Sequence, residues 1–398
     1  TDVLALYYAE HLDQGMIPYL DHNVEYPVLT GVFMGLLGLP IHAFGQSRPD
    51  LNQGMWFYNA NALVLGVLAV ATAGMMLGMR RRRPWDVAMF ALAPALLLTA
   101  TVNWDLLAIA LAVGGVYAWG RHRPLLAGVL LGLGTAAKLW PAFLFVPLIL
   151  LGLRVGRSRP VWAAVGVGAA TCLALNVPFM LANFKNWSEF IALNRRRGID
   201  WGTIWYIGDH MPRGDGEYGF GLFHDLGANI STLNIVTYVL ILLGFLAIGA
   251  LTLSAPHRPR FAQLAFLAVA VFLIFNKVWS QQFVLWLLPL AVLARPRWGA
   301  FLAWQAAEVC YFVAFYGELM GASGRNVFPE GVFVLASSLR LATVVVLCGF
   351  VVRDILDPER DAVRWTYPID PDGGLLNDFP DRRAAATALT PLARAPAR

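Results

Sequence analysis

The first stretch of the chain places carboxylates beside aromatic rings. It holds Asp2, Asp21 and Glu25 together with Tyr7, Tyr19 and Tyr26. Carboxylates accept hydrogen bonds from hydroxyl groups, and tyrosine rings stack against the apolar face of a sugar ring. This combination favours a sugar-binding loop, whereas a solvated loop would explain Glu10 and Asp13 equally well.

Three cations lie at or near membrane depth. Lys138 occurs in AAKLWP, where Pro141 must break the helix and free backbone carbonyls. Lys277 ends one apolar segment, and Arg340 lies inside the last one at a depth similar to that of Glu308. Charges at such depth are costly, so each needs a reason. Snorkelling accounts for Lys277 and pairing with Glu308 accounts for Arg340, but cations converging on one leaflet are also what a lipid-linked phosphate requires.

The composition identifies the solvent of these residues. Hydrophobic residues make up 58% of the 398 positions and charged residues only 14%, more apolar surface than a soluble domain can bury. Basic residues occur in short runs rather than along one face, which excludes a nucleic-acid partner. The three cysteines lie in apolar segments without CxxC spacing or nearby histidines, so neither a metal site nor a cofactor is predicted. We expect an all-α polytopic membrane protein.

Apolar segments of suitable length predict eleven membrane spans. The predicted spans are 56–79, 85–102, 104–120, 124–137, 139–153, 160–182, 233–253, 261–276, 281–294, 298–317 and 331–352. A further segment, 27–45, contains Gly31, Gly35, Gly38 and Pro40, and it is interpreted as an irregular helix that lies flat or re-enters the membrane. Several spans are short or interrupted by proline, which is tolerated in a membrane where the segment borders a water-filled cavity.

Arginine runs predict the orientation of these spans. They occur at 80–84, 121–124, 154–160, 257–260 and 295–297, in alternate loops. Because positively charged loops stay in the cytoplasm, the other loops are assigned to the extracytoplasmic face. These include a large first loop, 1–55, and a long loop, 184–232, and a helix entering from the cytoplasm is expected to precede the first loop. The last segment, 353–398, lacks an apolar period and is predicted to be a disordered cytoplasmic tail.

The order of several motifs resembles that of a known family. These motifs are TDVLALYY at 1–8, GMIPYLD at 15–21, VEYPVLTG at 24–31, NWDLLAIAL at 103–111, AAKLWP at 136–141, NRRRGIDWGTIWY at 194–206 and KVWSQQFVLWLLP at 277–289. The sequence resembles the GT-C fold membrane glycosyltransferases of family 87 over most of residues 1–352. The resemblance implies a helical cradle with a large first extracytoplasmic loop, and the charge pattern independently predicts the same layout.

The resemblance also implies roles for individual residues. Asp2 aligns with the catalytic base, with Asp21 and Glu25 as the alternatives, and Lys138, Lys277 and Arg340 would bind the donor phosphate. Asn103 and Asp105 replace a Gln-Asn pair common in relatives. The remaining substrate-binding candidates are Tyr7, Tyr19, Tyr26, Asn103, Asp105, Trp201, Trp205, Tyr206, Gln281 and Gln282.

The implied reaction is inverting transfer of a sugar from a polyprenyl-phosphate donor to a cell-envelope glycolipid or polysaccharide. Mannose is the first choice of sugar and arabinofuranose the second, and an actinobacterial plasma membrane is the implied location. A lipid-linked sugar flippase or transporter is the competing class, because it too would bind a lipid phosphate through cations and aromatic rings. The acidic first loop and the absence of an internal repeat in the sequence favour the transferase.

Overall fold

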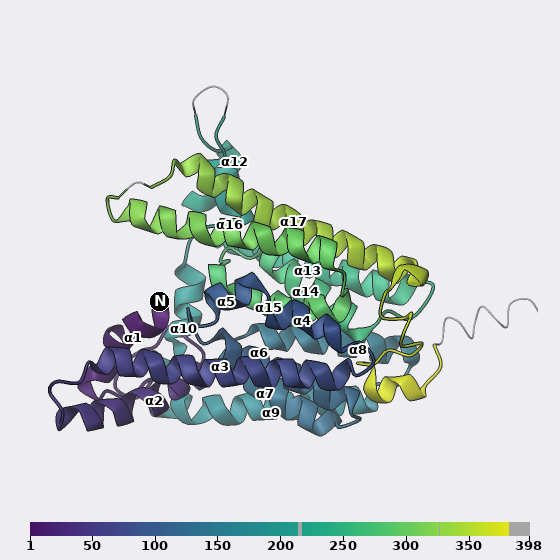
Figure 1. Ribbon diagram of the computed structural model, residues 1–398, viewed down its shortest axis with the longest axis horizontal. Helices are drawn as coiled ribbons and strands as arrows, with labels where there is room; N and C mark the ends of the chain where they lie inside the picture. The colour runs from purple at the N-terminus through teal and green to yellow at the C-terminus, as the bar shows by residue number, and fades with distance from the viewer. Residues whose placement is uncertain (214–216, 326, 382–398) are drawn as a thin grey trace, which may run out of the picture.

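The computed structural model describes residues 1–213, 217–325 and 327–381. Helices run along the long axis of the molecule, with the N-terminus at one end and the last described residues at the other (Figure 1). No β-strand occurs among the described residues. Six of the helices described there are long and apolar enough to cross a membrane. The predicted all-α polytopic membrane architecture is confirmed.

The six long helices form the outer part of the bundle. They are α2 (Val28–Gln46), α3 (Gln53–Met79), α9 (Arg159–Ala182), α13 (Ile230–Ser254), α16 (Trp298–Ala322) and α17 (Glu330–Leu356). Their apolar side chains project outward: Leu63 and Val70 of α3 are 71% and 73% exposed. Exposure of this kind on a long apolar helix matches a lipid-facing surface.

Shorter apolar helices fill the interior. They are α6 (Asp105–Gly120), α7 (Pro124–Ala137), α8 (Phe145–Val155), α14 (Phe261–Phe275) and α15 (Val284–Ala294). All eleven residues of α15 are buried. Two predicted spans, 139–153 and 281–294, begin as the 3-10 turns η3 (Trp140–Leu144) and η4 (Gln281–Phe283) before continuing as α8 and α15.

The predicted span 85–102 is wrong as a single crossing helix. The structure breaks it into η2 (Pro84–Val87), α4 (Ala88–Ala91) and α5 (Pro94–Thr99). The break falls at Pro94, whose ring excludes the preceding residue from helical geometry, and Ala93 is accordingly extended at ψ 124°. The fragments pack against α15 and α16.

The segment 27–45 is also more regular than predicted. It forms the continuous helix α2, which contains Pro40. Its glycines do not make the backbone irregular. They allow residues that precede α2 to pack closely against the helix. A Cβ on Gly31 would lie 2.3 Å from the Tyr19 ring, and one on Gly38 would lie 2.9 Å from Leu12. The residues that precede α2 therefore pack directly on this helix, a contact that helical periodicity alone does not reveal.

The helices α7 and α9 pack at very short range. A Cβ on Gly128 or Gly132 of α7 would lie 2.4 Å from the carbonyl oxygen of Ala164 or Gly168, respectively. Small residues spaced four apart allow backbones to approach in this way inside membranes. This contact fixes the end of α7, which carries Lys138.

The loop 184–232 contains three helices. They are α10 (Phe184–Arg196), α11 (Ile204–His210) and α12 (Gly221–Ala228). α10 lies near α1 (Asp2–Ala9) and the N-terminus, whereas α12 lies beyond α16 and α17 at the top of the view (Figure 1). A cavity opens beside α1 and α10, and both helices line it.

The predicted disordered tail is wrong for residues 353–381. α17 continues to Leu356, and the following residues pack over the ends of the interior helices through buried aspartates. Asp372 binds the Arg80 guanidinium at 2.7 Å and Asp361 binds that of Arg260 at 2.7 Å, with these four side chains at most 2% exposed. The arginine runs therefore serve partly as buried anchors. The remainder of the predicted tail, 382–398, lies outside the described residues.

Removing one of these aspartates should destabilise the fold. Asp372→Ala would leave the fully buried Arg80 without its carboxylate, and breaking a buried ion pair from one side costs about 3–5 kcal/mol. The control is Asp378→Ala, whose half-exposed carboxylate lies 3.8 Å from His122 and should change stability by less than about 0.5 kcal/mol. Thermal unfolding in detergent measures both. Equal melting temperatures for the two variants would contradict the anchoring role.

Candidate active site

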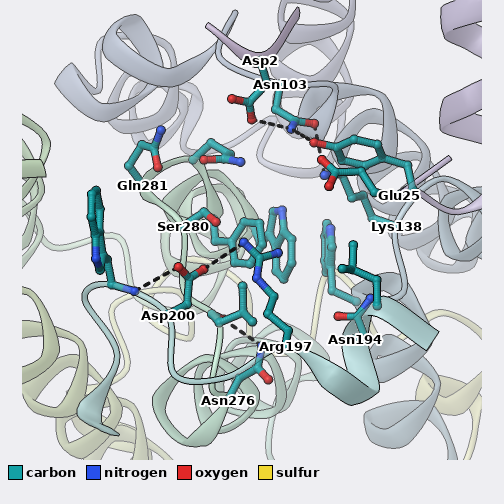
Figure 2. Close-up of a pocket in the computed structure, with 18 of the residues that line it drawn as sticks. Asp2, Glu25, Asn103, Lys138, Asn194, Arg197, Asp200, Asn276, Ser280 and Gln281 are labelled. Carbon is teal, nitrogen blue, oxygen red and sulfur yellow. Dashed lines mark hydrogen bonds and ion pairs between the residues drawn. The ribbon is translucent and has the colours of Figure 1, made fainter. Parts of the chain in front are cut away.

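A cavity of about 490 Å³ opens at the N-terminal end of the bundle. Its walls come from α1, the segment before α2, Asn103 just before α6, the α7–η3 junction, the 184–232 loop and the 276–283 turn. Figure 2 shows two groups of polar residues that face each other across it. Asp2, Glu25, Asn103 and Lys138 lie on one side, and Asn194, Arg197, Asp200 and Asn276 lie on the other.

A single amide organises the acidic side. The Asn103 Nδ2 donates to the Asp2 carboxylate at 2.9 Å and to the Tyr26 hydroxyl at 2.7 Å. Its Oδ1 accepts from the Lys138 ammonium at 3.1 Å and from the Trp104 backbone N–H at 2.7 Å. Asn103 thus separates Asp2 from Lys138 while binding both. The Asp2 carboxylate keeps a hydrogen bond without an ion pair among the described residues.

A second carboxylate, outside the cavity lining, pairs with Lys138. Asp105 lies 3.6 Å from the Lys138 ammonium and is fully buried. Its other contact is the Trp286 indole N–H, which donates at 2.6 Å. Asp105 is the first residue of α6, where the positive end of the helix dipole favours a negative charge. The Tyr26 ring lies 4.7 Å from the ammonium and adds a cation–π contact.

The position of Lys138 follows from the proline three residues later. Pro141 has no N–H, so the carbonyl of Ala137 loses its helical partner. The Thr30 hydroxyl donates to that carbonyl at 2.7 Å instead. Lys138 leaves the helix in an extended conformation, with ψ 143°, which directs it out of the α7 ladder and into the cavity wall.

The opposite wall carries an ion pair from the long loop. Arg197 lies 3.4 Å from Asp200, and the Asp200 backbone N–H donates to the Lys277 carbonyl at 2.9 Å. Burial raises the pKa of Asp200 and the Arg197 guanidinium opposes that rise. The Arg197 side chain is 44% exposed, so its guanidinium is accessible from the cavity.

Stacked aromatic rings lie between the two polar walls. The Trp286 ring stacks on Phe283 with centroids 3.9 Å apart and on Trp140 at 5.8 Å. All three line the cavity. Flat rings of this kind provide an apolar surface for a sugar ring or an isoprenoid chain.

Eight of the residues selected from the sequence line the cavity. They are Asp2, Glu25, Tyr26, Asn103, Lys138, Trp201, Gln281 and Gln282. The structure therefore brings the first loop, the NWD motif, the AAKLWP motif, the long loop and the SQQ turn to one place. Asp105 does not line the cavity and acts on it through Lys138.

Three first-loop candidates lie outside the lining. The Tyr7 hydroxyl donates to Gln53 at 2.8 Å, and the Asp21 carboxylate accepts from the Ile17 backbone N–H at 2.7 Å within a turn. The Tyr19 hydroxyl lies 2.9 Å from the carbonyl oxygens of Tyr26 and Pro27. Tyr19 therefore holds the backbone beside the cavity, and Asp21 is not placed to act as a base there.

Two of the three predicted phosphate-binding cations also lie outside the lining. Arg340 pairs with Glu308 at 3.1 Å and donates to the carbonyls of Trp279 and Ser280 at 3.0 Å each. Lys277 donates to the carbonyl of Arg197. Burial, and then the Arg197 charge, lower the pKa of Lys277. Both cations hold the backbone of the cavity wall, and the pairing expected as the alternative for Arg340 is what the structure has.

Two predicted aromatic residues lie outside the cavity lining. The Trp205 indole N–H donates to the Phe275 carbonyl at 3.0 Å, and Tyr206 stacks on His210 with centroids 3.9 Å apart. Neither reaches the cavity.

Sequence reasoning missed part of the opposite wall. Asp200, Asn194, Asn276 and Ser280 line the cavity but were not selected, and Arg197 appeared only within the motif NRRRGIDWGTIWY at 194–206. The i, i+3 spacing of Arg197 and Asp200 was the available signal, since it allows an ion pair within a loop.

The sequence profile of glycosyltransferase family 87 matches residues 29–276, more than half of the chain. The chain belongs to glycosyltransferase family 87. The matched segment contains Asn103, Lys138, Arg197 and Asp200, so residues from both cavity walls fall within it. A search of curated proteins finds no match. No group of three or more His, Cys, Asp or Glu side chains that could hold a metal occurs within the described ranges.

The buried carboxylate of Glu10 holds the segment that contains Glu25, a residue of the cavity lining. Glu10 is 6% exposed, lies 3.0 Å from the His22 imidazole and accepts the backbone N–H of Glu25. Burial, and then the Glu25 charge, raise the pKa of Glu10 to about 7. The folded state therefore binds a proton more tightly at Glu10 than the unfolded state does.

This shift predicts a pH dependence of stability. A raised carboxyl pKa stabilises the folded state fully below the unfolded value, near 4.5, and that stability is lost as the pH rises through about 7. The melting temperature in detergent should fall between pH 5 and pH 8, and Glu10→Gln should remove most of that fall. Asp50→Asn, at an exposed loop position, should retain it. An unchanged pH profile in Glu10→Gln would show that another group is responsible.

Proposed function

We propose that this family 87 glycosyltransferase transfers a sugar from a polyprenyl-phosphate donor, with inversion, to a hydroxyl of a cell-envelope glycolipid or polysaccharide. The observation that carries the proposal is the arrangement of one cavity. On one wall, Asn103 donates a hydrogen bond to the carboxylate of Asp2, which has no ion pair among the described residues. Each wall also carries one cation: Lys138 on the wall of Asp2, and Arg197 on the opposite wall.

Asp2 is the proposed base. Its carboxylate accepts one hydrogen bond from Asn103 and lines the cavity, which leaves oxygen lone pairs for an acceptor hydroxyl. The hydroxyl oxygen attacks the anomeric carbon as its proton passes to the carboxylate. The bond from the anomeric carbon to the phosphate oxygen breaks, and its electron pair leaves with polyprenyl phosphate. Attack opposite the leaving group inverts the anomeric configuration.

Lys138 and Arg197 are the proposed phosphate ligands. Both line the cavity, and each is partly neutralised by its own aspartate, Asp105 or Asp200. Two cations on facing walls can bind a phosphate between them and offset the charge that develops on the leaving oxygen. Lys277 and Arg340 act as positioning residues, since they bind backbone carbonyls of the wall.

Apolar residues give the lipid part of the donor a place to lie. Phe190, Leu193, Phe315 and Leu319 line the cavity from α10 and α16. An isoprenoid chain can lie against such a surface without leaving an apolar environment. Mannose is the first choice of sugar and arabinofuranose the second, from the family resemblance.

The arginine distribution supports an extracytoplasmic cavity in a plasma membrane. The runs that begin at Arg80, Arg121 and Arg295 follow the ends of α3, α6 and α15, and the run that begins at Arg154 starts in the last turn of α8. These ends lie at the opposite end of the bundle from the N-terminus (Figure 1). The cavity is lined by residues of α1, at the N-terminus itself. Positively charged loops remain on the cytoplasmic side, so the cavity faces the other side.

Purified protein with a polyprenyl-phosphate sugar and a lipid acceptor tests this proposal. A transferase releases free polyprenyl phosphate and lengthens the acceptor, as chromatography coupled to mass spectrometry would detect. A flippase or transporter leaves the donor intact while moving it between leaflets of a vesicle. Intact donor with protein-dependent movement would overturn the transferase assignment.

Replacing the base should separate binding from catalysis. Asp2→Asn keeps the shape of the side chain but removes its ability to accept a proton, so transfer should fall by at least about 10²-fold while donor binding persists. Asp50→Asn, outside the cavity, should retain full activity. Turnover is measured as product formed per folded enzyme. Full activity in Asp2→Asn combined with loss in Glu25→Gln would move the base to Glu25.

Two arginines of the same loop distinguish phosphate binding from general charge. Arg197→Gln removes the proposed phosphate ligand, and kcat/KM for the donor should fall by about 10²-fold. Arg195→Gln makes the same exchange two residues earlier, at an exposed position that does not line the cavity, and should change it less than threefold. Equal losses in both variants would indicate a surface-charge effect and exclude Arg197 as a ligand.

A further inference from the structure

A second hollow lies at the opposite end of the molecule from the candidate active site. It has a volume of about 510 Å³ and lies between the ends of α3 and α6 and the segment 367–371. Arg81, Arg82 and Arg121 line it, and no aspartate or glutamate does. Nothing in the transfer reaction uses this hollow.

The arginines of this hollow differ from their neighbours in their partners. Arg80 and Arg260 have aspartate partners at 2.7 Å. For Arg81, Arg82 and Arg121, no carboxylate lies within 4.0 Å in the part of the chain that the structure describes. The acidic C-terminal segment thus neutralises the buried arginines and leaves a positive charge of three where the hollow opens.

Aromatic rings and backbone hold two of these guanidinium groups in place. Arg121 lies over the Tyr117 ring at 5.0 Å and donates to the Gly78 carbonyl at 3.4 Å. Arg82 lies 5.9 Å from the Tyr367 ring, whose hydroxyl accepts the Arg82 backbone N–H at 2.8 Å. A guanidinium positioned in this way loses less rotamer freedom when it binds an anion.

The surroundings of the hollow fit the depth of lipid headgroups. α3 is one of the helices long enough to cross a membrane, and it ends at Met79, beside Arg81. Near this end the indoles of Trp85 and Trp365 are 82% and 64% exposed, and exposed tryptophans favour the membrane–water interface. Ile369, which is 61% exposed, adds an apolar side chain to the lining.

We propose that this hollow binds the phosphate group of an anionic phospholipid. Arg82 and Arg121 would donate to the phosphate oxygens, Arg81 would contribute long-range attraction, and Ile369 would contact the glycerol and first methylenes of the lipid. The ligand class follows from the position of the hollow, because a headgroup phosphate reaches it from the membrane and its acyl chains remain in lipid beside α3. The proposal is independent of the glycosyl donor site.

Native mass spectrometry of the detergent-solubilised protein tests this binding. The wild type should retain one phosphatidylglycerol adduct with an apparent affinity at least about tenfold above that for phosphatidylcholine. Arg82→Gln combined with Arg121→Gln should remove that preference. The matched control combines Arg123→Gln with Arg159→Gln, two exposed arginines that do not line the hollow, and should keep it within twofold.

A second variant tests the site independently, in case the double mutant fails to fold. Ile369→Glu keeps all three arginines and places a carboxylate in the hollow, so it should also remove the phosphatidylglycerol preference while thermal unfolding stays unchanged. A preference that persists in both variants, or that is lost equally in the control, would overturn the site. Displacement of the lipid by millimolar inorganic phosphate, with an equal rise in melting temperature, would assign the hollow to a free anion and overturn the lipid proposal.

Discussion

The candidate site depends on keeping a carboxylate and an ammonium close together without letting them pair. Asn103 achieves this by donating to Asp2 and accepting from Lys138. The lysine receives its counter-charge from Asp105, which lies behind the cavity wall and is buried. A direct ion pair between Asp2 and Lys138 would hold the proposed base in its ionised form too strongly to accept a proton. In the hydrogen-bonded arrangement, the Asp2 carboxylate can still accept a proton from the acceptor hydroxyl, and the Lys138 ammonium can still bind the donor phosphate.

The rest of the structure supports this arrangement from both walls. Pro141 ends α7 where Lys138 must leave the helix, and Thr30 satisfies the carbonyl that the proline frees. On the other wall, Arg340 binds the carbonyls of Trp279 and Ser280, which fixes the turn beside the cavity. Each such contact involves a buried polar group whose loss is expensive in a low-dielectric interior. Residues distant in sequence therefore hold the cavity open without touching a substrate.

Sequence reasoning predicted the class of fold and much of one cavity wall, because apolar length and buried charge are visible in a linear chain. Asp2, Asn103 and Lys138 were selected from their residue types and motifs, and they meet in one cavity. Reasoning failed where partners come from distant segments. Arg340 has a side chain that could bind a phosphate. Only the fold reveals that its guanidinium already binds Glu308 and two backbone carbonyls. The segment 353–381 was predicted to be disordered for the same reason. Its aspartates pair with arginines that are far away in sequence, and these ion pairs hold the segment in place.

The most direct test of this account is a structure of the protein with a bound non-hydrolysable analogue of a polyprenyl-phosphate sugar. The account predicts phosphate density within hydrogen-bond distance of Lys138 and Arg197, with the anomeric carbon facing Asp2 across a space large enough for a hydroxyl. Phosphate density bound to the exposed arginines at the other end of the bundle, with the cavity empty, would contradict it. So would density inside the cavity with the anomeric carbon directed away from both Asp2 and Glu25.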